Sequence, residues 1–198
     1  MKITQGDGPR LLVLAGLGGA AIAVHLGGAA TAGWLRYQRA AVLDGDWWRL
    51  LTAHLVHLNG GHLVMNLLAW LVIWFYAGRK LNGAQWLAGL LCCSLTTGFG
   101  LLLVSPGIDW YVGLSGVLHG LLATAALVRW RHGDRSGVWV LAGLVVKLSW
   151  EQLLGPLPGS VAAVGGAVVV DAHLYGALGG VLAGALIVCR RVPRTVSR

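Results

Sequence analysis

Residues 84–104 read AQWLAGLLCCSLTTGFGLLLV, an apolar stretch without a single charged side chain. A helix of this length can cross the hydrocarbon core of a bilayer, which is about 30 Å thick. Five other apolar stretches are of similar length, and the six expected spans are 11–32, 60–77, 84–104, 113–130, 137–155 and 171–189. The sequence therefore predicts an all-α membrane protein whose six transmembrane helices form a single domain over residues 1–198.

The composition of the whole chain agrees with this fold class. Hydrophobic residues make up 57% of the sequence and charged residues 11%, whereas about 25% of the residues in an average soluble domain are charged. A formal net charge of +8 would suit nucleic-acid binding, but the cations lie at the ends of apolar stretches and form no stripe on a polar face. We therefore expect contact with membrane lipid and no nucleic-acid partner.

The positive charges are distributed asymmetrically once the N-terminus is placed in the cytoplasm. The cytoplasmic segments then carry Lys2, Arg10, Arg79, Lys80, Arg129, Arg131, Arg135, Arg190, Arg191, Arg194 and Arg198. The outer segments carry Arg36, Arg39 and Arg49. Because cations accumulate on the cytoplasmic side, both termini are expected there, with residues 1–10 and 190–198 as tails. The long segment 33–59 is expected to lie in the outer interface as an amphipathic element.

Strongly polar side chains inside the expected spans cluster at one depth. In this topology His62, Asn66, Ser115, His119 and His173 all belong to the outer half of the membrane. A polar group in hydrocarbon is costly unless it is paired or faces a wet cavity, so such a cluster indicates a functional site. A lone serine usually bonds a carbonyl one turn back in its own helix, and the inference therefore depends on the cluster.

Ser115 and His173 have the chemistry of a nucleophile and a base. Small residues near them are Gly113, Gly116, Gly176 and Gly180. Such residues allow helices to approach closely, so an imidazole at the start of one span could reach a hydroxyl at the start of another. His62 and Asn66 lie four residues apart on one helix face and could direct N–H donors at a developing negative charge, together with the backbone N–H of Ser115.

Taken in order, these residues resemble the motifs of the rhomboid family of intramembrane serine proteases. The motifs are Trp48-Arg49 with Thr52, His57, His62-xxx-Asn66, Gly113-x-Ser115-Gly116 and Ala172-His173-xx-Gly176-xxx-Gly180. The resemblance runs from about residue 44 to 184 and implies the six-helix rhomboid fold. It implies Ser115 as the nucleophile, His173 as the general base, and His62 with Asn66 as oxyanion donors. No cofactor and no metal are expected.

His119 departs from the general pattern, because rhomboids usually carry a bulky aromatic or apolar residue at that position. The run GLSGVLHG at 113–120 resembles the rhombosortase branch, which is associated with removing C-terminal Gly-Gly anchors from exported proteins in Gram-negative bacteria. This resemblance implies a multi-pass protein of the bacterial inner membrane with its active site toward the periplasm. The implied partners are single-span membrane proteins with a C-terminal anchor.

Other interpretations of the same residues stay open. They are a general rhomboid protease with broader single-span substrates, a non-catalytic rhomboid-like binding protein, and a haem-binding bundle that uses His62 and His173. An intramembrane zinc protease is disfavoured because the sequence contains no HExxH motif. His119, four residues after Ser115, is a rival base, although a packing or hydrogen-bonding role beneath His173 is favoured.

Two acidic residues lie close to the expected site. Asp171 precedes His173 by two residues and projects from another helix face, so an interfacial cap is preferred to a third catalytic residue. Lys147 and Glu151 are one turn apart inside an apolar span, which is the pattern of an ion pair. Alternatively, Glu151 contacts the substrate or binds an amine that replaces water as acyl acceptor, which would give the enzyme a transpeptidase-like activity.

Overall fold

The computed structural model describes residues 7–189 and shows a helical bundle with one two-stranded sheet. The longer helices are α1 (Gly8–Leu26), α5 (Gly60–Ala77), α6 (Gly83–Leu103), α7 (Ser115–Arg131), α8 (Ser136–Leu154) and α10 (Val170–Cys189). The shorter elements are α2 (Gly28–Leu35), β1 (Tyr37–Gln38), α3 (Arg39–Leu43), α4 (Arg49–Thr52), η2 (Ala53–Leu55), η3 (Gly78–Lys80), β2 (Trp110–Tyr111) and α9 (Ser160–Val164). The two strands pair antiparallel, with Tyr37 opposite Tyr111.

Five of the described helical segments are long and apolar enough to cross a membrane. They are Gly8–Leu26, Gly60–Lys80, Gly83–Leu103, Ser136–Leu154 and Val170–Cys189. At the expected fourth span, 113–130, helix α7 has 17 residues and carries Arg129 and Arg131 in its last turn. The structure thus confirms a bundle of helices of membrane type, while the count of six spans and the orientation of the two termini stay predictions.

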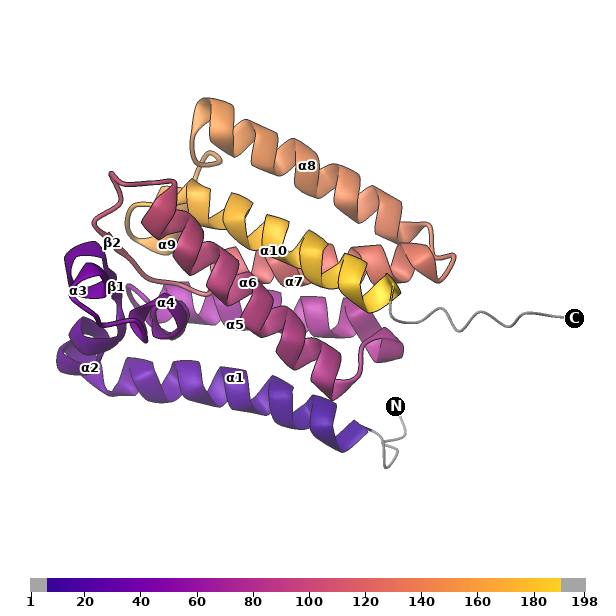
Figure 1. The fold of residues 1–198 in the computed structure, drawn as a ribbon, viewed down its shortest axis with the longest axis horizontal. Helices are drawn as coiled ribbons and strands as arrows, with labels where there is room; N and C mark the ends of the chain where they lie inside the picture. Colours follow the sequence, from indigo (N-terminus) through magenta and orange to yellow (C-terminus); the bar gives the residue numbers. More distant parts are fainter. Residues whose placement is uncertain (1–6, 190–198) are drawn as a thin grey trace, which may run out of the picture.

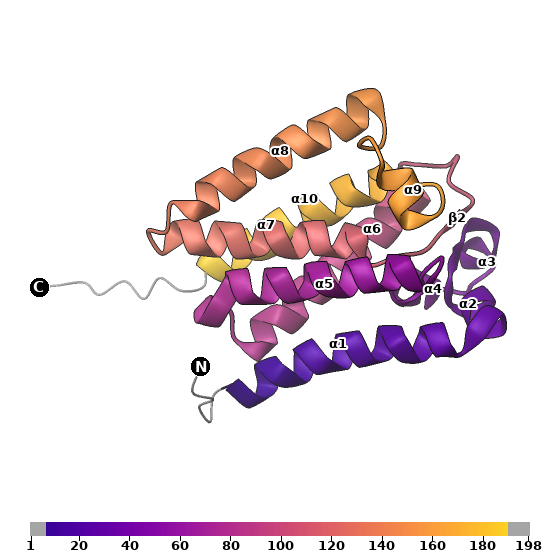
Figure 2. The ribbon, with the colours of Figure 1, turned by 180° about the vertical axis from the view of Figure 1, so that it is seen from behind.

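Helix α7 lies in the middle of the bundle (Figures 1 and 2) and packs against α5, α6, α8 and α10. Most of its residues between Gly116 and Val128 are buried. A helix with such surroundings is in contact mainly with protein, and small residues such as glycine and alanine suit that position. Because α7 begins at Ser115, this residue stands at the end of the most enclosed helix.

The first expected span, 11–32, is wrong at its outer end. Helix α1 ends at Leu26, and α2 begins at Gly28 after a break in the helix. Gly28 has a φ of +71°, a conformation that glycine adopts without strain, and one continuous helix cannot pass through it. Of the two expected tails, residues 1–6 and 190–198 lie outside the described residues, whereas residues 8–10 already belong to α1.

The short elements gather at one end of the bundle. Figures 1 and 2 show α2, α3, α4, α9 and both strands at this end, while α1 begins and α10 ends at the opposite end. Helices α1 and α8 form the two outer edges, and α7 and α10 lie between them. Since α7 and α10 both begin at the end that carries the short elements, their first turns are brought to the same level.

The segment 33–59, expected as an amphipathic interfacial element, folds as a series of short elements. Trp47 and Trp48 are exposed, as suits side chains at the level of lipid headgroups. Arg49 is buried and donates to three acceptors: the Asp46 carboxylate at 2.8 Å and the carbonyls of Gly33 and Arg36 at 2.9 and 3.0 Å. The N–H donors of the planar Arg49 guanidinium therefore connect separate parts of the segment 33–59 to one another.

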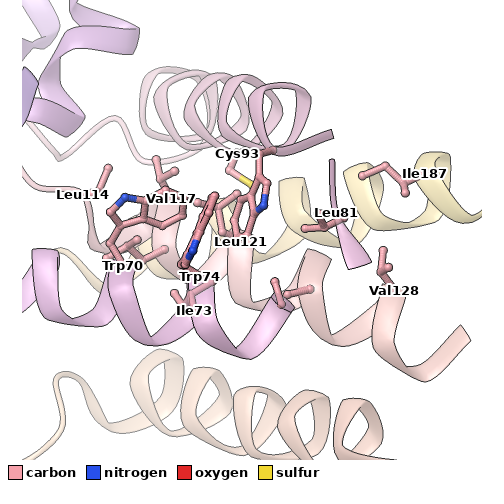
Figure 3. Packing of buried hydrophobic residues seen from close by; sticks show 14 residues of the cluster. Trp70, Ile73, Trp74, Leu81, Cys93, Leu114, Val117, Leu121, Val128 and Ile187 are labelled. Atoms are coloured by element: carbon pink, nitrogen blue, oxygen red, sulfur yellow. The ribbon is translucent and has the colours of Figure 1, made fainter. Parts of the chain in front are cut away.

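Three tryptophans, Trp70, Trp74 and Trp86, belong to the apolar core between α5, α6 and α7, and Figure 3 labels Trp70 and Trp74, with Leu114 near Trp70. The ring centroids of Trp70 and Trp86 lie 5.0 Å apart edge to face, and those of Trp74 and Trp86 lie 5.3 Å apart in a stack. Aromatic pairs with this spacing contribute about 0.5–1.5 kcal/mol each beyond their buried area. Leu114 immediately precedes α7, so this core holds the start of that helix.

Helices α7 and α10 approach each other through glycines. A Cβ atom added at Gly116 would lie 2.6 Å from the carbonyl oxygen of Ala172, and one added at Gly180 would overlap the backbone of Gly120. The Thr124 hydroxyl of α7 donates to the Gly180 carbonyl of α10 at 2.9 Å. Backbone-to-backbone packing of this kind sets the spacing between the first turns of the two helices.

Candidate active site

Ser115 and His173 meet where α7 and α10 begin. Ser115 is the first residue of α7, and His173 lies in the first turn of α10. The Ser115 Oγ lies 3.0 Å from the His173 Nε2, a normal hydrogen-bond distance. His173 is buried and Ser115 is partly exposed, so the hydroxyl is held by the imidazole and still open to a cavity.

The other nitrogen of the His173 ring faces Glu151 of α8. The distance from His173 Nδ1 to Glu151 Oε2 is 2.9 Å. An ionised carboxylate can only accept hydrogen bonds, so the proton of a neutral His173 lies on Nδ1. The lone pair on Nε2 is then free to accept the proton of Ser115. The geometry is that of a serine hydroxyl paired with an imidazole base.

The second oxygen of Glu151 is bonded to Lys147, one turn earlier in α8, at 2.6 Å. The Glu151 side chain is 2% exposed and that of Lys147 is 30% exposed. The pair expected from their spacing is therefore present. Both carboxylate oxygens take part in a hydrogen bond in the described arrangement, and the substrate or acceptor contact considered for Glu151 stays a prediction.

The sequence alone does not predict the contact between Glu151 and His173. Helical periodicity brings Lys147 next to Glu151, but it says nothing about which residue of α10 crosses α8. One signal in the sequence indicates such a contact: Glu151 is the single glutamate of the chain, and it lies in an apolar stretch close to the expected site. A buried carboxylate at the depth of a histidine requires a partner.

His119 lies beneath the base. Its ring is nearly parallel to that of His173, with centroids 4.2 Å apart and an interplanar angle of 18°. The His119 Nδ1–H donates to the carbonyl of Ser115 at 2.7 Å, because a carbonyl oxygen can only accept. The imidazole considered as a rival base is thus directed at the backbone of Ser115, and the hydroxyl of Ser115 is directed at His173.

His62 and Asn66 approach the same site from α5. The His62 Nδ1 accepts a hydrogen bond from the backbone N–H of Leu58 at 3.4 Å, which places the proton of a neutral ring on Nε2. Gly113 has a φ of +122°, and a Cβ atom added at Gly113 would lie 3.1 Å from the Nε2 of His62. The Asn66 amide donates to the His62 carbonyl at 3.2 Å and has a second N–H.

A cavity of about 190 Å³ joins these groups. Its polar lining residues are His62, Asn66, Ser115, His119, Lys147, Glu151, Ser160 and His173. The backbone N–H of Ser115, at the first position of α7, has no carbonyl partner within its helix, and the partial positive charge of a helix N-terminus lies there. The cavity therefore combines a nucleophile, a base and several N–H groups suited to an oxyanion.

A larger cavity of about 480 Å³ lies between α8 and α10. Its lining is almost wholly apolar and includes Leu144, Leu148 and Leu178. None of its lining residues has a titratable side chain. Of these two cavities, it is the smaller one that the proposed reactive groups line.

Among the described residues, His119, Glu151 and His173 could hold a metal ion. Their ligand atoms all lie within 4.8 Å of one another, and imidazole with carboxylate is a donor set that suits zinc. The ammonium group of Lys147 lies 2.6 Å from the Glu151 carboxylate, and this positive charge opposes a second cation at the same oxygen atoms.

Two further polar residues, Asp171 and His54, have partners other than the reacting atoms. Asp171 accepts a hydrogen bond from the Ser105 hydroxyl at 2.5 Å, so this carboxylate is bonded to Ser105. His54, which lies outside the membrane-type helices, donates to the Ser94 carbonyl at 3.1 Å. Burial lowers the pKa of the His54 imidazole to about 4, so this ring is neutral at physiological pH and serves the packing of η2.

Comparison with known proteins agrees with this geometry. Residues 44–190, more than half of the chain, match the family model described as Rhomboid domain. The chain is similar to Rhomboid protease GlpG of Salmonella paratyphi A, 26% identical over 148 residues, which cover 69% of this chain and 50% of the relative. Proteins of the same name from Salmonella newport and Salmonella heidelberg are 28% identical over 119 residues, covering 57% of this chain and 40% of each relative.

The chain spans half or less of the length of these curated relatives. The matched segment nevertheless contains α5 to α10 in full, and with them Ser115, His173, Glu151, His62 and Asn66. Since the family model covers most of the chain and the whole of the cavity with its serine and histidine, this chain belongs to the rhomboid family.

Proposed function

We propose that this protein is an intramembrane serine protease with Ser115 as nucleophile and His173 as general base. The observation that carries the proposal is the 3.0 Å contact between Ser115 Oγ and His173 Nε2 inside a bundle of helices of membrane type. The relatives that share this segment bear the name protease, which supports hydrolysis of a peptide bond as the reaction.

The reaction begins when His173 Nε2 takes the proton of Ser115 and the serine oxygen attacks a peptide carbonyl. The protonated His173 then gives that proton to the leaving amine, and an acyl-enzyme remains on Ser115. Water attacks the acyl-enzyme after passing its proton to His173, and the proton returns to Ser115 as the carboxylic acid leaves. Every proton taken by the imidazole is returned, so the enzyme ends as it began.

Negative charge that develops on the carbonyl oxygen needs donors. The backbone N–H of Ser115, the Nε2–H of His62 and the free N–H of Asn66 are the groups available in the cavity. Removing one such donor costs about 2.7–4 kcal/mol of transition-state stabilisation in a serine protease. His62 and Asn66 are therefore proposed as oxyanion donors.

The proposed membrane topology has six spans, with α7 as the fourth and both termini in the cytoplasm. At the end of the bundle where α1 begins and α10 ends, the described cations are Arg10, Arg79, Lys80, Arg129, Arg131 and Arg135. Such an accumulation is typical of a cytoplasmic surface. The cavity at the opposite end then faces the periplasm of a bacterial inner membrane.

The proposed substrate is a single-span protein with a C-terminal membrane anchor that carries a Gly-Gly sequence at its outer end, as in the rhombosortase branch. His119 beneath His173 supports this branch, because it is the residue that departs from the general rhomboid pattern. A cavity of about 190 Å³ suits small side chains, and glycine also lowers the cost of unwinding the substrate helix. The names of the relatives favour a second candidate, a rhomboid protease with broader single-span substrates.

Three measurements on the purified membrane protein test these proposals. Fluorophosphonate labelling should mark wild type and fail on Ser115→Ala; an unlabelled wild type that cleaves no single-span substrate would remove the protease proposal. A substrate with Gly-Gly should be cut and its Leu-Leu counterpart should not. Equal cleavage of both would assign the protein to the broader candidate. The mass of the released product distinguishes hydrolysis from transfer to an amine.

A further inference from the structure

We propose that Glu151 is a positioning residue for His173, held in turn by Lys147. The inference rests on the proposed function, in which His173 is the base. Three contacts form one chain across α8, α10 and α7: Lys147 Nζ to Glu151 Oε1 at 2.6 Å, Glu151 Oε2 to His173 Nδ1 at 2.9 Å, and His173 Nε2 to Ser115 Oγ at 3.0 Å. The serine and histidine pair thus has an acidic third member supplied by α8.

The first effect of Glu151 is on the tautomer of His173. A neutral imidazole carries its proton on either nitrogen, and if the proton is on Nε2 the ring cannot accept from Ser115. The Glu151 carboxylate has no hydrogen to donate, so it selects the tautomer with the proton on Nδ1. It also fixes the plane of the ring, which would otherwise rotate about the side-chain bonds of His173.

The second effect is on the charge that His173 acquires. When the imidazole takes the proton of Ser115 it becomes a cation, and Glu151 provides a negative charge 2.9 Å away. Both side chains are nearly inaccessible, 7% and 2% exposed, so their attraction is weakly screened. Before the reaction, the positive charge of Lys147 offsets the negative charge of Glu151. After proton transfer, the positive charge of the His173 imidazolium offsets the negative charge of the oxyanion, so the net charge of the site does not change.

Lys147 is what allows a carboxylate to be ionised at this depth. A buried charge without a partner is strongly destabilising, and the ammonium group of Lys147 gives the Glu151 carboxylate such a partner. The Lys147 side chain is itself 30% exposed and lines the cavity. It also determines which Glu151 oxygen faces His173, because it occupies the other one.

The other ionisable groups near His173 are engaged elsewhere. His119 stacks beneath the ring and donates to the Ser115 carbonyl, and His62 lies across the cavity on α5. Asp171 accepts from Ser105. Among the described residues, Glu151 is the carboxylate bonded to His173.

Glu151→Gln tests the proposal. Lys147 requires an acceptor and takes the amide oxygen of the glutamine, which turns the NH₂ group toward His173 Nδ1. That group donates a hydrogen bond, so the proton of the imidazole moves to Nε2 and Ser115 loses its acceptor. We expect kcat to fall about 10²- to 10⁴-fold with KM little changed, as when the acid of a serine protease triad becomes its amide.

Two further variants separate positioning from structural support. The double variant Lys147→Met with Glu151→Gln leaves no unpaired charge, and its amide oxygen is free to accept from His173 Nδ1. It should therefore be more active than Glu151→Gln alone and less active than wild type. Glu151→Asp retains the carboxylate and should recover part of kcat. Asp171→Asn is the matched control, an acid-to-amide change at a carboxylate bonded to Ser105, and it should leave kcat unchanged.

The outcomes are distinct from those of the proposed function. If wild type shows no Ser115-dependent labelling or cleavage, the protease proposal fails first. If wild type is active and Glu151→Gln retains its kcat, or the double variant equals wild type, only the positioning role of Glu151 is overturned. A rise in KM with unchanged kcat would assign Glu151 to substrate binding instead. Loss of wild-type activity with a chelator, restored by Zn²⁺, would replace this inference with a metal site at His119, Glu151 and His173.

Discussion

The Glu151 carboxylate lies 2.9 Å from the Nδ1 of His173, although the two residues are 22 positions apart and belong to different helices. The contact ties α8 to α10 at the level of Ser115. The orientation of the proposed base therefore depends on the packing of three helices. A small change in that packing should lower the rate of cleavage while the free energy of unfolding is still close to that of wild type.

Ser115→Ala and His173→Ala should each lower cleavage by about 10³-fold or more, because residues that act as a unit lose almost all activity when either is removed. Ser115→Ala should unfold at close to the wild-type temperature, and His173→Ala, which removes one partner of the buried Glu151 carboxylate, should remain folded with a lower unfolding temperature. Cleavage of a single-span substrate in detergent micelles, with thermal unfolding beside it, measures both. An active His173→Ala variant together with an inactive His119→Ala variant would move the base to His119.

His119→Ala should retain measurable activity. The stacked contact with the His173 ring, with centroids 4.2 Å apart, supports the base without exchanging a proton with Ser115. Losing a ring pair of this kind costs about 0.5–1.5 kcal/mol, so we expect a fall in kcat of about 2- to 10-fold. His119→Phe should recover most of the loss, since it restores the stacking surface. A phenylalanine variant as poor as alanine would show that the imidazole nitrogens of His119 are required.

Gly180→Leu should reduce cleavage by at least about 10-fold, because a displacement of about 1 Å at a reacting group can cost 10²-fold. A side chain at Gly180 would overlap the backbone of Gly120 and push α10 away from α7. Gly143→Leu on α8 is the control, since a Cβ at Gly143 meets nothing within 4 Å. Normal turnover by a well-expressed Gly180→Leu variant would show that activity does not require the close approach of α10 to α7 at Gly180.

The free energy of unfolding should fall as the pH drops from about 6.5 to 4. Burial lowers the pKa of His54 to about 4 and that of His57 to about 4, against about 6.5 in an unfolded chain. In that window the unfolded chain binds protons that the folded protein does not, so acid favours unfolding by up to about 1.4 kcal/mol per pH unit for each histidine.

Thermal unfolding in micelles at pH 7.5 and 5 checks this expectation, with a lower melting temperature at pH 5. His54→Gln has an amide N–H for the Ser94 carbonyl and no group that titrates there, so its melting temperature should depend less on pH. A pH dependence equal to that of wild type would show that His54 does not contribute.

Several features of the molecule follow from the sequence alone. Low charge and long apolar stretches are sufficient to predict membrane helices, because the hydrocarbon core admits few other backbone structures. The spacing of Lys147 and Glu151 predicts their contact, since residues four apart lie on one face of any helix. The order of the motifs around Ser115 and His173 indicates the rhomboid family, which the family match confirms.

Tertiary structure decided the remaining features. The break between α1 and α2 depends on a positive φ at Gly28, and a glycine in a sequence permits that conformation without requiring it. The partner of Glu151 on α10 depends on how α8 crosses that helix. Periodicity determines the neighbours of a residue within its own helix, but the rotation and crossing of two helices are set by the packing of the whole bundle, where glycines such as Gly116 and Gly180 let the backbones meet.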